Sequence, residues 1–212
     1  MKKPTSKQNT YLKCGTCCIK DGPVLHLEDM ELIKKKILIP ENMVLLRRGE
    51  PAMDNILGRP VLLGNELIKI RGEKPGSWTC IFHDSKTNLC LIHENRPLQC
   101  RSLECWNTTE IINLYHQNTL SRKDLFSGVS ALEEITLMHE EKCPVESFVE
   151  LLRMEISSPG RSAGPQLREM ISFDEHFRKV FQEKTGASSK SLDYYFGRSL
   201  KKLIPLVTRY IS

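Results

Sequence analysis

Thiol groups are the side chains of this sequence with the most distinctive chemistry. Of its 212 residues, eight are cysteines, which is more than an intracellular core needs as small hydrophobic side chains. They are Cys14, Cys17, Cys18, Cys80, Cys90, Cys100, Cys105 and Cys143. None lies between residues 144 and 212, although that stretch is rich in core-type residues. Because thiolates bind zinc and iron–sulfur clusters, this clustering predicts that all eight cysteines are metal ligands.

The start of the chain, MKKPTSKQNTYLK, is basic and contains no apolar segment of the kind found in a secretory signal. The sequence also has no apolar run near the roughly twenty residues that a membrane-spanning helix needs. We therefore expect a cytoplasmic protein without a membrane span, in which thiols stay reduced and bind metal. A disulfide network is the alternative if the protein is exported by another route.

The first group of cysteines is Cys14-Gly15-Thr16-Cys17-Cys18. Two intervening residues allow Cys14 and Cys17 to reach one metal ion, and Gly15 permits the positive φ that such a turn can require. In extended backbone Cys18 points away from Cys17, so either the chain bends there or the two residues serve different centres. The same C-x-x-C spacing occurs in thioredoxin-like redox pairs, but the βαβ context of that motif is missing.

The second group, which spans 26 residues, consists of Cys80, Cys90, Cys100 and Cys105. Short strands are expected on either side of a turn near residues 84–88, and the Asn-Arg-Pro sequence at 95–97 is typical of a helix start. That helix would carry Cys100 and Cys105 about 140° apart, so one of them can ligate metal while the other packs.

These two groups resemble the YkgJ-type cysteine-cluster proteins, which are described as zinc- or iron-chelating and are often called iron–sulfur proteins. The family pattern is roughly C-x-x-C-G-x-C-C, then a lone Cys, a Cys followed by Ile-Tyr, an Arg-Pro step and Cys-Arg. The matching residues here are Cys14, Gly15, Cys17, Cys18, Cys80, Cys90, Ile92, Arg96, Pro97, Cys100 and Arg101. The resemblance covers about residues 10–106 and implies a metal centre. The step Cys143-Pro144 is similar to a late Cys-Pro in longer members.

Two residues depart from the family pattern. Tyr11 stands where the first family cysteine is expected, and His93 stands where the family has a tyrosine. Cys105 or Cys143 could restore the number of ligands, and His83 or His93 could supply a nitrogen. His83 also has metal-ligand spacing from the first cysteine of the second group.

The metal remains open between an iron–sulfur cluster and zinc. Structural zinc usually takes its four ligands as two close pairs, and here Cys14 and Cys17 form the one such pair. The irregular spacing of the other cysteines favours an iron–sulfur cluster, because its irons are spread over a larger body. Eight thiols suffice for one or two centres, and one cluster plus one zinc also fits. Arg96 and Arg101 would stabilise thiolates, or they are solvated surface charges.

The elements that must position these residues are mostly helices. Apolar residues at helical spacing predict helices over 27–38, 108–117, 130–141, 145–156, 166–183 and 191–211, the last with a kink at Pro205. His139 would then lie one helical turn before Cys143 and could face it. A Gly-Asn step between apolar pieces predicts a β-hairpin over residues 61–70. Residues 157–165 break the helical pattern, and the two helices after this break are expected to pack as a helical hairpin.

We therefore predict a mainly α protein with small β elements (α+β), in which metal stabilises the N-terminal part and helices form the C-terminal part. The predicted regions are a metal-binding region at 1–106, its helical continuation at 107–157 and a helical hairpin at 166–212. The predicted function is metal binding through an iron–sulfur cluster or zinc, with redox activity and an unidentified protein or redox partner.

Two alternatives to this function stay open. One is a cluster-dependent protein-modifying enzyme, since some relatives are linked with lysine methylation of flagellin, although no glycine-rich S-adenosylmethionine motif follows a strand here. The other is a zinc-stabilised interaction module without catalysis. The sequence leaves open whether the protein is an enzyme. No specific nucleic acid partner is expected, and the motifs of serine hydrolases, phosphate loops and dinucleotide-binding folds are missing.

Overall fold

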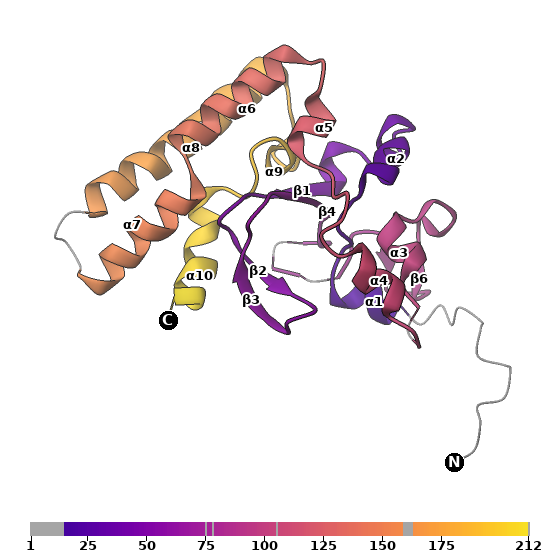
Figure 1. Ribbon diagram of the computed structural model, residues 1–212. Coiled ribbons are helices and arrows are strands. Elements are labelled where there is room, and N and C mark those ends of the chain that lie inside the picture. The colour runs from indigo at the N-terminus through magenta and orange to yellow at the C-terminus, as the bar shows by residue number, and fades with distance from the viewer. Residues whose placement is uncertain (1–14, 75, 78, 105, 159–162, 212) are drawn as a thin grey trace, which may run out of the picture.

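A computed structural model describes the protein over residues 15–74, 76–77, 79–104, 106–158 and 163–211 (Figure 1). Its helices are α1 Thr16–Lys20, α2 Met30–Lys34, α3 Leu98–Ser102, α4 Thr109–Leu114, α5 Arg122–Phe126, α6 Ser130–Lys142, α7 Val145–Ser157, α8 Ala163–Thr185, α9 Leu192–Tyr195 and α10 Leu200–Ile211. Its strands are β1 Met43–Leu46, β2 Pro51–Asp54, β3 Arg59–Leu62, β4 Leu67–Ile70, β5 His83–Asp84 and β6 Leu89–Cys90. The predicted mainly α fold with small β elements is confirmed.

The strands form two-stranded antiparallel sheets, which pair β1 with β4, β2 with β3 and β5 with β6. The β-hairpin predicted over residues 61–70 is wrong, because its two halves pair with different strands. In the β1–β4 sheet Leu45 lies opposite Ile68, and both side chains are fully buried. A local hairpin would have paired β4 with β3, which is largely exposed, and would have left the apolar strand β1 without a partner.

Three long helices, α6, α7 and α8, form one end of the molecule, where α7 and α8 pack against each other (Figure 1). The helices predicted over 130–141 and 145–156 are confirmed as α6 and α7. The helix predicted over 191–211 is instead divided into α9 and α10, because Gly197 between them takes a left-handed φ of +70°. α10 continues through Pro205 and packs on α7 as well as on α8, so the predicted two-helix hairpin becomes a three-helix core. None of the described helices is both long and apolar enough to cross a bilayer.

Two predicted helices are shorter in the structure than their periodicity indicated. The segment 27–38 forms a 3-10 turn at Leu27–Asp29 followed by α2, and Lys36 then takes a φ of +56°. The segment 108–117 forms α4, and His116 beyond it takes a φ of +64°. A left-handed residue ends a helix because it turns the chain away from the helical path.

The core beneath the N-terminal strands receives side chains from the C-terminal part of the chain. Leu25, Ile68 and Phe126 are buried there together with Tyr194 of α9. The rings of Phe126 and Tyr194 meet edge to face, with centroids 5.7 Å apart. The predicted N-terminal region therefore completes its core with a residue from near the C-terminus.

A buried ion pair connects the N-terminal strands to the C-terminal helices. Arg47 follows β1, and both Arg47 and Glu50 are fully buried. Arg47 Nη1 donates to the Cys143 carbonyl oxygen at 2.9 Å, and Arg198 Nε donates to Glu50 Oε2 at 2.8 Å. These bonds join the turn between β1 and β2 to the end of α6 and to the loop between α9 and α10.

We expect Arg47→Ala to lower the free energy of unfolding by about 3 kcal/mol, because it removes a buried partner of the Glu50 carboxylate and of a buried carbonyl. Arg48→Ala is the matched control, since Arg48 pairs with Glu146 at 3.0 Å while both side chains are largely exposed. Its effect should stay below about 1 kcal/mol. Urea denaturation followed by circular dichroism measures both, and equal losses for the two variants would contradict the prediction.

Candidate metal centre

The two cysteine groups, which are distant in the sequence, meet near α1, α3 and β6 (Figure 1). Cys17 and Cys18 lie in α1, Cys90 ends β6 and Cys100 lies in α3. The Cys80 N–H donates to the Cys18 carbonyl oxygen at 2.7 Å, so a backbone hydrogen bond joins the two groups. These five residues are called the cysteine cluster below.

The thiols of the cysteine cluster are close enough to affect one another's ionisation. Burial raises the pKa of Cys100, and negative charge on Cys80, Cys17 and Cys90 raises it further. Burial likewise raises the pKa of Cys80 to about 11, with contributions from Cys90 and Cys17. The metal-free cluster therefore resists carrying several thiolates at once, and a bound cation would supply the charge that stabilises them.

Cys17 and Cys18 form a thiol pair whose sulfur atoms lie 3.9 Å apart. The hydrogen bond from Cys18 lowers the pKa of Cys17 to about 6, with a smaller contribution from the positive charge of Arg96. The same hydrogen bond raises the pKa of Cys18. The pair therefore gives up its first proton more readily than an ordinary thiol does. Helical backbone explains how both adjacent residues reach the cluster, because it separates neighbouring side chains by about 100° rather than placing them on opposite faces.

The first cysteine group lies against the turn between β5 and β6. Gly15, directly before α1, has a φ of +69°, and a β-carbon there would clash with the Asn88 side chain and lie 2.8 Å from His83 Nε2. Glycine alone combines this left-handed backbone with so close an approach. His83 Nε2 and Asn88 Oδ1 are themselves 2.9 Å apart, which fixes the surface that Gly15 contacts.

Helix α3, which carries Cys100, is anchored by the segment that follows α1. Asp29 is fully buried and accepts a hydrogen bond from the Leu98 N–H at 2.8 Å, at the start of α3. Gln99 Oε1 accepts a hydrogen bond from the Val24 N–H at 2.7 Å. Asp29 was not identified from the sequence, where it reads as one acid in an ordinary helix start.

His83 lies beside the cysteine cluster and is a candidate nitrogen ligand. It lies opposite Cys90 in the β5–β6 pair, and its Nδ1 is buried without a hydrogen-bond partner among the described residues. Such a ring nitrogen could ligate a metal ion. His93, the other predicted nitrogen ligand, has Nδ1 3.0 Å from Glu94 Oε1. The predicted ligands Cys14 and Cys105 lie outside the described residues.

Cys143 lies apart from the cysteine cluster. It follows α6 and is fully buried in the core that α7, α8 and α10 form. Burial raises the pKa of its thiol to about 12. Its neighbours are His139, which the helical spacing had placed beside it, and Asp174, which no sequence signal marked. Any metal bound by Cys143 therefore occupies a centre of its own.

The geometry defines a class of protein in which an N-terminal cysteine group and a second group some sixty residues later in the chain build one thiol cluster. Residues 11–118 match the family CxxCxxCC, whose description is "Putative zinc- or iron-chelating domain". The chain belongs to this family, which confirms the resemblance to cysteine-cluster proteins and supports zinc or iron chelation. No curated protein and no solved structure matches the chain.

We expect Gly15→Ala to weaken metal retention by about tenfold or more, because the added β-carbon pushes the first cysteine group away from the β5–β6 turn. Gly58→Ala is the matched control, since Gly58 has a similar φ of +65° but no heavy atom within 4 Å of an added β-carbon. Chelator competition on anaerobically purified protein measures retention. If both variants lose metal equally, the close contact of Gly15 is not what positions the cluster.

We also expect metal uptake to release protons and metal affinity to fall as the pH is lowered from 8 to 6. Burial keeps the pKa values of Cys80, Cys90 and Cys100 above their ordinary value, so these thiols are protonated before metal binds. Each one that becomes a ligand must lose its proton, and acid therefore competes with the metal. Isothermal titration calorimetry in two buffers of different ionisation enthalpy counts the protons; an uptake heat that is independent of the buffer would contradict this.

Proposed function

We propose that the protein holds an iron–sulfur cluster on its cysteine cluster and exchanges electrons with a protein partner through it. The distances between the sulfur atoms are the main observation that supports this proposal. Five described thiols lie close enough to shift one another's pKa, which is more than one four-coordinate ion requires, yet no three of these described thiols lie within 4.8 Å of one another.

A single tetrahedral zinc ion, with Zn–S distances of about 2.3 Å, brings its sulfur ligands to about 3.8 Å from one another. Cys17 and Cys18 meet this distance. Among the described residues, however, no third sulfur of the cysteine cluster joins them within 4.8 Å. A body with several irons spans larger ligand separations, so the wider spread of the thiols supports an iron–sulfur cluster.

The position of the cysteine cluster near the surface suits electron exchange with another protein. Cys17, Cys18, Cys90 and Cys100 are each partly exposed. Leu91, directly after β6, is 68% exposed and lies next to the cluster residue Cys90. A partner that covered this apolar side chain would bring its own redox group close to the cluster.

A structural zinc ion is the second candidate. The 3.9 Å separation of the Cys17 and Cys18 sulfurs favours it, and so does the burial of Cys80 in the N-terminal core. In this case the metal would contribute folding free energy and would carry no electrons.

Metal and sulfide analysis of anaerobically purified protein tests the proposal. We expect a brown protein that contains iron and acid-labile sulfide and whose visible absorption bleaches reversibly with dithionite. Cys90→Ser should remove most of the iron, because it deletes one of the proposed thiolate ligands. Lys86→Ser, in the exposed turn between β5 and β6, is the control and should keep the iron content of the wild type.

The outcomes separate the two candidates. A colourless protein that contains zinc and no sulfide would refute the iron–sulfur cluster and support the zinc ion. A brown protein that cannot be cycled between two oxidation states would retain the cluster but refute electron exchange.

A further inference from the structure

We propose that His139, Cys143 and Asp174 bind one divalent transition-metal ion, zinc being the ion whose ligand preferences they fit. This centre is separate from the cysteine cluster and lies outside the family region, residues 11–118. An imidazole nitrogen, the Cys143 sulfur and a carboxylate oxygen all lie within 4.8 Å of one another, and all three residues are fully buried. Imidazole, thiolate and carboxylate are the three ligand types of protein-bound zinc.

Two helices bring these side chains together. His139 lies in the last turn of α6, and the Cys143 N–H donates to the His139 carbonyl oxygen at 2.9 Å. Residues four apart on a helix share a face, so both side chains point the same way. Asp174 meets them from the middle of α8, which lies beside α6 (Figure 1). The site therefore depends on the packing of α6 against α8.

His139 faces Asp174 with the ring nitrogen that would ligate the ion. Its Nε2 lies 2.8 Å from Asp174 Oδ1, and because the carboxylate accepts, Nε2 carries the proton in the metal-free protein. Nδ1 points away from Asp174 on the other side of the ring and could not share an ion with it. Metal binding would replace the hydrogen bond: Nε2 would ligate the ion, and the neutral ring would carry its proton on Nδ1 instead.

Asp174 is ionised and held in one position. Burial acts to raise its pKa, but the hydrogen bond with His139 and the charge of Arg178 hold that pKa well below its usual range. Arg178 Nε donates to Oδ1 at 2.7 Å, and the Leu200 N–H donates to Oδ2 at 2.9 Å. Hydrogen bonds of this kind orient the carboxylates that ligate metal ions.

The charges around His139, Cys143 and Asp174, called the trio below, are compatible with a bound cation. Burial raises the pKa of the Cys143 thiol, and the positive charges of Arg47 and Arg178 oppose that rise. Arg47 lies 3.8 Å from carboxylate oxygens of both Glu50 and Glu140, and Arg178 lies 3.9 Å from a carboxylate oxygen of Asp193. Carboxylates other than the proposed ligand Asp174 therefore balance part of the guanidinium charge.

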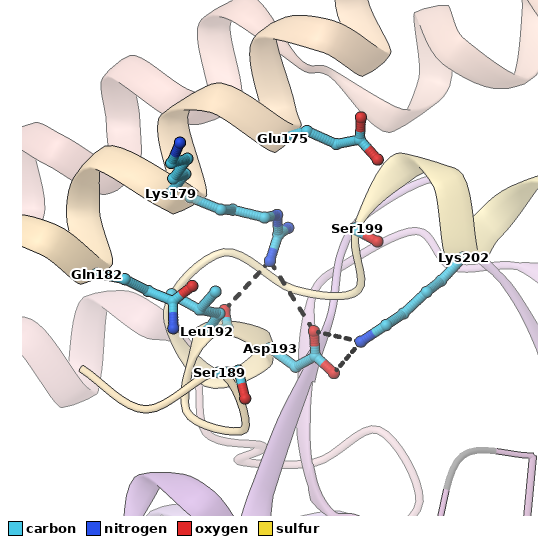
Figure 2. A pocket seen from close by; sticks show the side chains of 9 residues that line it. Glu175, Lys179, Gln182, Ser189, Leu192, Asp193, Ser199 and Lys202 are labelled. Atoms are coloured by element: carbon cyan, nitrogen blue, oxygen red, sulfur yellow. Dashed lines mark hydrogen bonds and ion pairs between the residues drawn. The ribbon is translucent and has the colours of Figure 1, made fainter. Parts of the chain in front are cut away.

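The surroundings of the trio indicate a structural rather than a catalytic ion. The rings of Phe177 and Phe196 lie against the His139 ring, with centroids 5.3 and 4.9 Å away. On the outer side Arg178 lines a surface pocket, in which Figure 2 shows Asp193 paired with Lys202. A closed site gives substrate no access, so the ion would connect α6 to α8 and would exchange when these helices separate.

Counting zinc in the full-length protein tests this centre. Protein expressed with zinc and treated with EDTA while folded should retain one zinc equivalent more than Cys143→Ala, and should release it on unfolding in guanidinium. Thr136→Val is the matched control, because Thr136 is buried on the same helix but does not belong to the trio. It should keep the wild-type zinc count. Native mass spectrometry gives the counts, and circular dichroism shows that each variant is folded.

Equal zinc counts in folded wild-type protein and folded Cys143→Ala would overturn the proposal. If Cys143→Ala does not fold, anomalous scattering at the zinc edge from wild-type crystals decides. A peak between the three side chains supports the centre, and its absence overturns it. Cys90→Ser separates the two centres, since it should remove metal from the cysteine cluster and leave this zinc in place.

Discussion

The thiols of the cysteine cluster are brought close together by hydrogen bonds in which no thiol group takes part. The Cys80 N–H to Cys18 carbonyl hydrogen bond holds the two cysteine groups together, and Asp29 fixes the start of the helix that carries Cys100. Gly15 lets the first group approach the β5–β6 turn. The thiols are therefore brought together at an electrostatic cost, because burial raises the pKa of most of them. A bound cation relieves this cost, and so the metal and the fold stabilise each other.

Sequence periodicity predicted the elements whose formation is decided locally. α6 and α7 each run for 13 residues, and their spacing alone placed them within one residue or two. The hairpin predicted at 61–70 was wrong because β4 pairs with β1. This pairing buries both strands against the core, and the sequence of either strand alone does not reveal it. The last predicted helix was divided at Gly197, where the chain turns so that α9 can enter one core and α10 another.

The candidate sites likewise combine features that local sequence determines with features that tertiary packing determines. Cysteine spacing was sufficient to define the two groups, since ligand residues recur at short intervals, and that they share a metal stays a prediction. It could not separate Cys143 from the others, because that separation follows from the packing of α6, α7 and α8. Asp29 and Asp174 were not identified for a related reason. Each is a single acidic residue within a helix or turn, and its partner lies more than thirty residues away in the sequence.

Because Tyr194 packs beneath the N-terminal strands, the N-terminal core cannot be completed until that residue has been synthesised. Translation delivers the cysteines of α1, β6 and α3 first, whereas the aromatic ring that packs against Phe126 emerges only after α8. A nascent chain that lacks α9 leaves part of the surface around Leu25 and Ile68 uncovered. The N-terminal core can therefore close only after α9 has been made.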